Sequence, residues 1–304
     1  MIPLSPAGKR LRMLFRSGKA IQMPGAFNGL CGRIAADAGF QALYLSGGAL
    51  SAARGVPDIG LCSLDHFTRT IREVAVVSEL PILADADTGF GEAESVTQTV
   101  VEYMQAGAGG LHLEDQAFPK RCGHLDGKEL IPVDHMAEKI KRAKTASGNS
   151  GFVICARTDA RGVEGFEAAV GRAVAYVESG ADMIFPEGLS NISEFEQFAT
   201  EMRKMGDLGL APQGGPFLLA NMTEFGKTEH ILLKDFESAG YHSVIYPVST
   251  LRVAMKAVED MLLELKAKET LKDAEKDMMT RKRLYEVLRY KPGLEWSYPS
   301  SAGK

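Results

Sequence analysis

The sequence has few cysteines, and none is placed for a disulfide framework or a structural zinc site. The four cysteines are far apart, with no Cys-x-x-Cys pair; they are Cys31, Cys62, Cys122 and Cys155. This scarcity indicates a reducing compartment, and we expect a cytoplasmic protein. No apolar run approaches the roughly 20 residues that cross a bilayer, so we expect no membrane partner.

Long blocks of one charge are also missing. The formal net charge is only −4 and the basic residues are scattered, so we expect no nucleic-acid partner. No acidic residue precedes Asp37, and such a basic start is typical of a mitochondrial transit peptide. We favour an N-terminal amphipathic helix within residues 1–19, because Leu11 and Phe15 would pack on the core and a strand-like segment begins at Ala20.

The phosphate loops of nucleotide-binding folds are absent. Gly107-Ala108-Gly109 is followed by His112 where a third glycine would stand, and there is no Walker A sequence. An open, doubly wound sheet therefore lacks its usual motif and is kept only as the alternative fold.

The chain alternates short apolar segments with amphipathic helical patterns such as 93–105 and 166–177. Eight strands alternating with helices predict an α/β fold, the closed parallel (β/α)8 TIM-type barrel, as a single domain over residues 1–304. Two apolar stripes predict a C-terminal helical extension over 250–290, followed by a tail over 291–304. The predicted strands are 20–23, 42–45, 82–85, 110–114, 152–156, 182–185, 217–220 and 243–246.

Most of these strands end in polar residues. Taken singly, each is explained by a cap or a turn, but in a barrel all of them meet at the C-terminal face and can converge on one small ligand. They are Ser46, Gly47, Gly48, Asp85, Asp87, Glu114, Arg157, Glu187, Asn221 and Tyr246.

Three of these residues have the chemistry of a metal site. Asp85 and Asp87 point to the same side of an extended backbone, and Glu114 follows the next strand. Hard oxygen donors completed by water and substrate suit Mg²⁺ or Mn²⁺ better than zinc. The alternative is structural, with Asp87 capping a helix or the carboxylates binding main-chain amides.

The segment Lys120-Arg121-Cys122-Gly123-His124 places one thiol among three basic groups. The cations favour the thiolate and lower its pKa, while the nearby carboxylates oppose this, so that Cys122 is poised to donate or accept a proton. Gly123 gives the segment a hinge for closing over substrate. A buried, inert cysteine is the ordinary alternative.

Two further motifs predict anion binding. Arg157 can clamp a substrate carboxylate with two parallel hydrogen bonds, or it can pair with Asp159 or Glu187. The turn Ser46-Gly47-Gly48 offers a hydroxyl and open main-chain amides, although a plain glycine turn explains it nearly as well.

Together these motifs resemble the isocitrate lyase and phosphoenolpyruvate mutase superfamily, and within it the 2-methylisocitrate lyases. The resemblance extends from about residue 5 to 290, and the motifs in this order are highly specific. They are 45–48 (Leu-Ser-Gly-Gly), 85–91 (Asp-Ala-Asp-Thr-Gly-Phe-Gly), 112–116 (His-Leu-Glu-Asp-Gln), 120–124, 156–160 (Ala-Arg-Thr-Asp-Ala), 185–187 (Phe-Pro-Glu) and 219–226 (Leu-Ala-Asn-Met-Thr-Glu-Phe-Gly).

The resemblance implies Mg²⁺-dependent cleavage of 2-methylisocitrate, a tricarboxylate, to pyruvate and succinate. It implies that Cys122 is the general acid and leaves Tyr44 and Glu187 as candidates for the base. The implied metal-site positions are Asp85, Asp87, Glu114 and Asp58. The implied substrate-binding positions are Ser46, Gly47, Gly48, Lys120, Arg121, Gly123, His124, Arg157, Glu187, Asn221 and Thr223.

The resemblance also implies a homotetramer in which the eighth barrel helix is exchanged between subunits; two helices folded on their own barrel are the alternative. Dimethylmalate or isocitrate cleavage is the competing activity, and a non-catalytic carboxylate-binding barrel is the competitor that is not an enzyme. Oxaloacetate decarboxylases and ketopantoate hydroxymethyltransferases share the barrel but lack the cysteine motif. Residues 204–215 form a glycine-rich segment that is longer than the family pattern.

Overall fold

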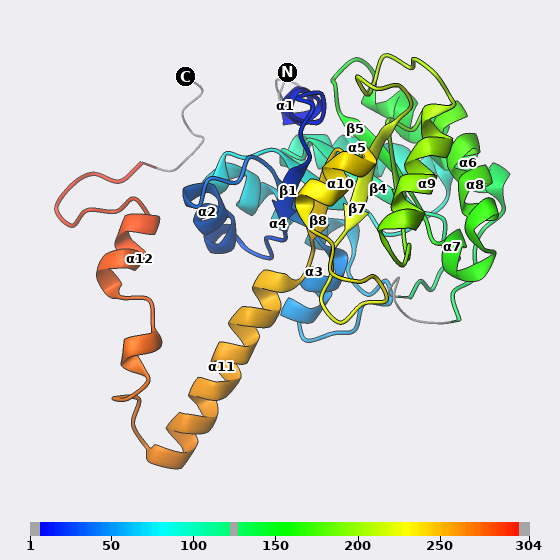
Figure 1. Ribbon diagram of the computed structural model, residues 1–304. Helices are drawn as coiled ribbons and strands as arrows, with labels where there is room; N and C mark the ends of the chain where they lie inside the picture. Colours follow the sequence, from blue (N-terminus) through cyan, green and yellow to red (C-terminus); the bar gives the residue numbers. More distant parts are fainter. Residues whose placement is uncertain (1–6, 122–126, 298–304) are drawn as a thin grey trace.

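Eight parallel strands form the centre of the molecule (Figure 1). The structure is a computed structural model, and it describes residues 7–121 and 127–297. The sheet order is β1-β8-β7-β6-β5-β4-β3-β2. All eight predicted strands are present, with ends shifted by at most two residues. They are β1 Ile21–Pro24, β2 Leu43–Leu45, β3 Ile82–Asp85, β4 Gly110–Glu114, β5 Val153–Thr158, β6 Met183–Pro186, β7 Phe217–Asn221 and β8 Ser243–Tyr246.

The ring closes between the two strands at the ends of this order. A single parallel bridge joins Gly25 to Tyr44, and the amide of Ala26 donates to the Tyr44 carbonyl at 2.9 Å. A Cβ at Gly25 would lie 2.1 Å from the Pro247 carbonyl oxygen, so only glycine allows this close approach. The (β/α)8 barrel is therefore confirmed and the open doubly wound sheet is wrong.

Helices follow the strands and cover the outside of the barrel. An outer apolar core packs between strands and helices, and an inner one fills the barrel. The helices are α1 Ala7–Phe15, α2 Gly29–Asp37, α3 Gly47–Ala53, α4 Leu64–Ser78, α5 Ala93–Ala106, α6 Val133–Ser147, α7 Ala160–Val163, α8 Phe166–Glu178, α9 Ile192–Arg203, α10 Leu233–Ala239, α11 Ser249–Lys268 and α12 Arg281–Val287, with a short 3₁₀ turn at Glu275–Asp277.

The predicted N-terminal helix is α1, which packs against the N-terminal end of the barrel. Leu11 and Phe15 are fully buried in the inner core, and the Phe15 and Phe217 rings lie 5.3 Å apart. Arg12 donates to the carbonyls of Gly151 and Phe152, which satisfies main-chain groups just before β5.

Strand alternation carries polar residues into the barrel mouth. In β5, Cys155 belongs to the inner core while Ile154 and Ala156 belong to the outer one. Because side chains alternate every residue, the next inward position after Cys155 is Arg157, at the C-terminal end of the strand. The same period places Asp85 two residues after the inward Leu83.

The C-terminal segment leaves the barrel. Helix α11 projects away from it, and α12 returns to lie beside α2 (Figure 1). Leu251 is the buried residue of α11, whereas Val287 of α12 is buried and its carbonyl accepts a hydrogen bond from Arg33. Within the described part of the chain, no helix has the length and apolarity needed to cross a membrane.

Candidate active site

A pocket of about 280 Å³ opens at the C-terminal end of the strands. It brings together residues that the sequence predicted from seven separate segments. Those that line it are Tyr44, Ser46, Gly48, Asp58, Asp85, Lys120, Arg121, Arg157, Glu187, Asn221 and Thr223. Gly47, Asp87 and Glu114 adjoin it through hydrogen bonds or ion pairs to this lining.

Asp85 is held rigidly at the end of β3. Its Oδ2 accepts the amide of Gly47 at 2.9 Å, and its Oδ1 accepts the amide of Asp87 at 2.9 Å. The Tyr103 hydroxyl donates to the Asp85 carbonyl at 2.6 Å, which fixes the main chain as well. Part of the predicted anion-binding turn thus binds a carboxylate of the protein itself.

Asp87 lies beyond the strand, in a left-handed turn with φ of 46°. This conformation is uncommon for a non-glycine residue and is characteristic of functional sites. Lys120 Nζ lies 2.6 Å from Asp87 Oδ1 and 2.7 Å from Asp58 Oδ1. A buried ammonium therefore joins two of the predicted metal-site carboxylates.

Glu114 ends β4 in a different setting. Neither of its carboxylate oxygens accepts a hydrogen bond from the described residues, although Arg157 Nη1 lies 3.3 Å from Oε2. Arg157 instead gives two hydrogen bonds to Asp159, from Nε at 3.0 Å and from Nη2 at 3.2 Å. The paired donors expected to clamp substrate are engaged within the protein, which leaves Nη1 directed toward Glu114.

The electrostatics of the cluster follow from burying several like charges together. Burial raises the pKa of Glu114 to about 8, and burial and the charge of Asp85 raise the pKa of Asp87 to about 7. Burial also opposes ionisation of Asp85, but the neighbouring His112, Lys120 and Arg157 outweigh it and lower its pKa to about 2. A further cation would stabilise the ionised form of all three carboxylates.

His112 and Tyr44 form a buried pair behind the carboxylates. The Tyr44 hydroxyl and His112 Nε2 are 2.7 Å apart, and the same nitrogen lies 3.6 Å from Asp85 Oδ1. Burial lowers the pKa of His112 to about 4, so the ring is neutral at pH 7. Burial and the charge of Asp85 raise the pKa of Tyr44, which keeps its hydroxyl protonated.

The donor set fits a hard divalent cation. It consists of carboxylate oxygens, and those of Glu114 are buried without a hydrogen bond from the described residues. Among residues 7–121 and 127–297, no three His, Cys, Asp or Glu side chains are close enough to hold an ion as they stand. The ammonium of Lys120 lies between two of these carboxylates, those of Asp58 and Asp87. The structure therefore shows the cluster with a lysine ammonium as its cation.

Comparisons with known proteins show the family of this chain. The model of the phosphoenolpyruvate phosphomutase family matches residues 11–266. A probable 2-methylisocitrate lyase of Corynebacterium glutamicum is 47% identical over 92% of this chain and 90% of its own length. The chain belongs to this family.

Solved structures of the family have the same fold. A 2,3-dimethylmalate lyase is 31% identical, with a TM-score of 0.84 over 94% of this chain and 92% of that one. A phosphonopyruvate hydrolase in complex with oxalate and Mg²⁺ is 28% identical, with a TM-score of 0.80 over 93% of this chain and 95% of that one. Lyases of this superfamily use a divalent metal ion.

Three of the predicted residues, Cys122, Gly123 and His124, lie outside the described residues. Asn221 Nδ2 donates to Glu187 Oε2 at 3.1 Å, and Thr223 lines the pocket beside them.

Sequence reasoning missed several supporting residues. Asp159, which holds Arg157 and Lys128, was considered only as an alternative partner, and buried Asp115 accepts hydrogen bonds from Thr158 and Tyr176. The strand-end position of Asp115, next to Glu114, was the available signal. Arg252 on α11 also lines the mouth, and it had no such signal.

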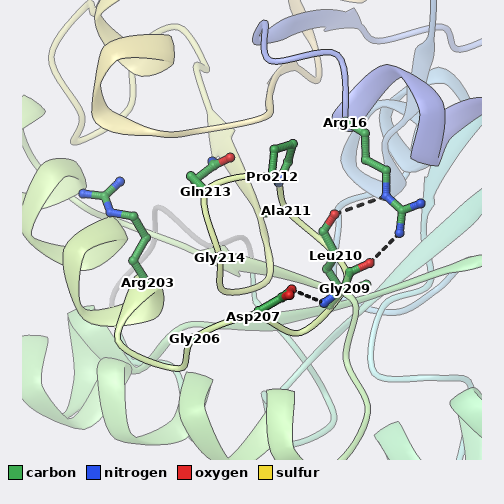
Figure 2. A pocket seen from close by; sticks show the side chains of 10 residues that line it. All are labelled: Arg16, Arg203, Gly206, Asp207, Gly209, Leu210, Ala211, Pro212, Gln213 and Gly214. Atoms are coloured by element: carbon green, nitrogen blue, oxygen red, sulfur yellow. Dashed lines mark hydrogen bonds between the residues drawn. The ribbon is translucent and has the colours of Figure 1, made fainter.

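The glycine-rich segment 204–215 lies at the opposite end of the barrel, where it connects α9 to β7. It surrounds a hollow of about 570 Å³ (Figure 2). There Arg16 donates to the carbonyls of Leu210 and Gly209. This segment therefore lies at the N-terminal end of the barrel, away from the pocket at the mouth.

Proposed function

We propose that this protein is a 2-methylisocitrate lyase that cleaves 2-methylisocitrate to pyruvate and succinate in the cytoplasm, in the methylcitrate cycle of propionate breakdown. Membership of the lyase family supports an enzyme of this class. The observation that carries the proposal is the convergence of Asp85, Lys120, Arg121 and Arg157 on one pocket, with Glu114 paired to Arg157 beside it.

We propose that Asp85, Asp87 and Glu114 hold Mg²⁺, with Mn²⁺ as the alternative and Asp58 in reach through water. The ion would polarise the substrate oxygens and stabilise the negative charge that develops on cleavage. The protein would orient these carboxylates through the Gly47 amide on Asp85 and the guanidinium of Arg157 beside Glu114.

The proposed reaction moves two protons. A base takes the proton of the substrate 2-hydroxyl, the C2–C3 bond breaks to leave pyruvate, and the electron pair passes into the carboxylate of what becomes succinate. Glu187 is the better base. Burial raises the pKa of Tyr44 and keeps its hydroxyl protonated, and this hydroxyl is already hydrogen-bonded to His112. Tyr44 would then orient the substrate. The Cys122 thiol would return a proton to the succinate carbon.

Comparative turnover tests this proposal. Purified protein with Mg²⁺ is assayed for pyruvate release from 2-methylisocitrate, isocitrate and 2,3-dimethylmalate side by side. We expect 2-methylisocitrate to give the highest kcat/KM, excess chelator to abolish turnover and added Mg²⁺ to restore it. Preference for dimethylmalate would support the second candidate, which the likeness to a dimethylmalate lyase favours. Full activity in chelator would exclude the metal-dependent mechanism.

We also propose a homotetramer that exchanges α11 between subunits. Helix α11 exposes large apolar side chains, among them Val253, Leu262 and Leu263, that need a partner surface. Light scattering should give four subunits for the full chain, and truncation after Ala254 should dissociate or aggregate it. A well-behaved, active monomer of the truncated protein would contradict the exchange.

A further inference from the structure

Lys120 lies inside the acidic cluster at the barrel mouth. Its side chain is only 3% exposed, and its Nζ lies 2.7 Å from Asp58 and 2.6 Å from Asp87. A Cβ built on Gly47 would lie 2.9 Å from Asp85 Oδ2 and 3.2 Å from Asp87 Oδ1. These two carboxylates therefore converge on bare backbone at Gly47, with the ammonium of Lys120 against one of them.

An ammonium and a divalent cation need the same oxygens here. Mg²⁺ requires carboxylate oxygens at about 2.0–2.1 Å in a nearly ideal octahedron, whereas the ammonium now holds Asp87 Oδ1 at 2.6 Å. Two cations a few ångströms apart in a buried site also repel each other strongly. A divalent cation that binds Asp87 Oδ1 therefore has to displace the ammonium from that oxygen.

We propose that Lys120 is a resident cation of the metal site: its ammonium holds Asp58 and Asp87 in the metal-free protein, and a divalent cation binds by displacing it. The inference rests on the metal-dependent function proposed above. Lys120 also lines the substrate pocket. Its displaced ammonium becomes available to a substrate carboxylate, which makes metal bind before substrate.

Lys139 provides a matched control. It is a second buried lysine near the cluster, and its Nζ donates to the main-chain oxygen of Thr88 at 2.9 Å, one residue after Asp87. Lys139→Met removes the same charge from the same neighbourhood, without removing an ammonium from the carboxylates. It therefore separates competition for the oxygens from a general effect of positive charge.

Titration of the full-length protein with Mn²⁺, followed by the electron paramagnetic resonance of the free ion, tests the proposal without an activity assay. We expect Lys120→Met to bind Mn²⁺ tighter than wild type by about 5- to 150-fold, the usual range for coupled sites, because no resident cation has to leave. Lys139→Met should bind as wild type does. Equal or weaker binding by Lys120→Met would overturn the inference.

A second measurement needs only the wild-type protein. Acetylation of the Lys120 amine by acetic anhydride is quantified by peptide mass spectrometry, with and without Mn²⁺, using the more exposed Lys144 as an internal reference. We expect Lys120 to react slowly without metal and several times faster with it. If Mn²⁺ binds but the acetylation rate of Lys120 does not rise, the inference about Lys120 is overturned while the proposed function stands. Failure of every variant to bind Mn²⁺ would overturn the proposed function as well.

Discussion

The two ends of the barrel use charge in opposite ways. At the N-terminal end, arginines satisfy main-chain groups: Arg12 donates to the carbonyls of Gly151 and Phe152, and Arg16 to those of Gly209 and Leu210. At the C-terminal end, carboxylates are buried side by side, and Glu114 accepts no hydrogen bond from the described residues.

The same strands therefore contribute to stability at their N-terminal ends and to the candidate active site at their C-terminal ends. β5 begins beside the carbonyls that Arg12 binds and carries Arg157 near its other end, at the mouth. Buried carboxylates whose oxygens lack hydrogen-bond donors destabilise a protein unless a ligand compensates them. The C-terminal end therefore has the features of a site built for a ligand, and the N-terminal end those of a support for it.

The largest expected effect is at the mouth. Glu114→Gln should reduce pyruvate release below detection, because it removes a charged metal ligand. It should also leave the metal-free protein as stable as wild type or more stable, by up to about 2 kcal/mol, since a buried carboxylate is costly. Coupled pyruvate assays and urea unfolding measure the two effects.

A matched control lies at the other end, where Glu237 accepts the amide of Ala20 at 2.9 Å. Glu237→Gln keeps an acceptor and should keep full activity. Clear destabilisation by Glu114→Gln, or retained turnover, would contradict the proposed division between the two ends.

The next effect concerns the sulfur of Cys122. Removal of a positioned general acid typically costs about 10² to 10⁴ in rate, and serine has a far higher pKa than cysteine. Cys122→Ser should therefore lose at least about two orders of magnitude in kcat with KM little changed, as steady-state kinetics would show. Cys31→Ser, outside the mouth, is the control. Near-normal turnover of Cys122→Ser, or a substrate adduct on the wild-type sulfur detected by mass spectrometry, would refute the assignment.

A smaller effect, on stability alone, is expected at the N-terminal end. Arg12→Met removes two hydrogen bonds to carbonyls and the 2.7 Å ion pair with buried Asp182. We expect a loss of about 2–4 kcal/mol in the free energy of unfolding, measured in urea, with kcat unchanged. Arg69→Met breaks only an exposed pair with Asp65 and should cost under about 0.5 kcal/mol. An equal loss in both variants would show that burial does not decide the effect.

Much of this comparison could be predicted from the sequence, because it depends on local period. The bounds of β3, β4 and β8 match the prediction, and two-residue alternation was enough to bring Asp85 and Glu114 to one face. The prediction of the barrel followed from counting strands and helices, and the bridge between Gly25 and Tyr44 confirmed its closure.

Contacts between loops could not be predicted in this way. The pairing of Lys120 with Asp58 joins segments whose approach is set by tertiary packing and not by any period. The choice of Asp159 as partner of Arg157 depends on side-chain geometry within one turn. That α11 leaves its own barrel was implied only by the resemblance.

The smallest expected effect is a pH dependence at the N-terminal end. His242 is 5% exposed and its Nδ1 accepts the amide of Leu218 at 3.0 Å, while burial lowers its pKa to about 4. The unfolded chain, with a histidine pKa near 6.5, binds the proton more readily, so stability is lost as the pH falls from about 6.5 to about 4. This loss is at most about 3 kcal/mol for one group.

His242→Asn isolates that contribution, because the amide oxygen can still accept from Leu218 but does not titrate. The variant should lose less unfolding free energy than wild type between about pH 6.5 and pH 4, measured by urea unfolding across this range. His135→Asn, at an exposed position, should follow wild type. Identical pH profiles for His242→Asn and wild type would show that the N-terminal end of the barrel tolerates a charged His242. The hydrogen bond from the Leu218 amide would then contribute less to stability than we infer from its burial.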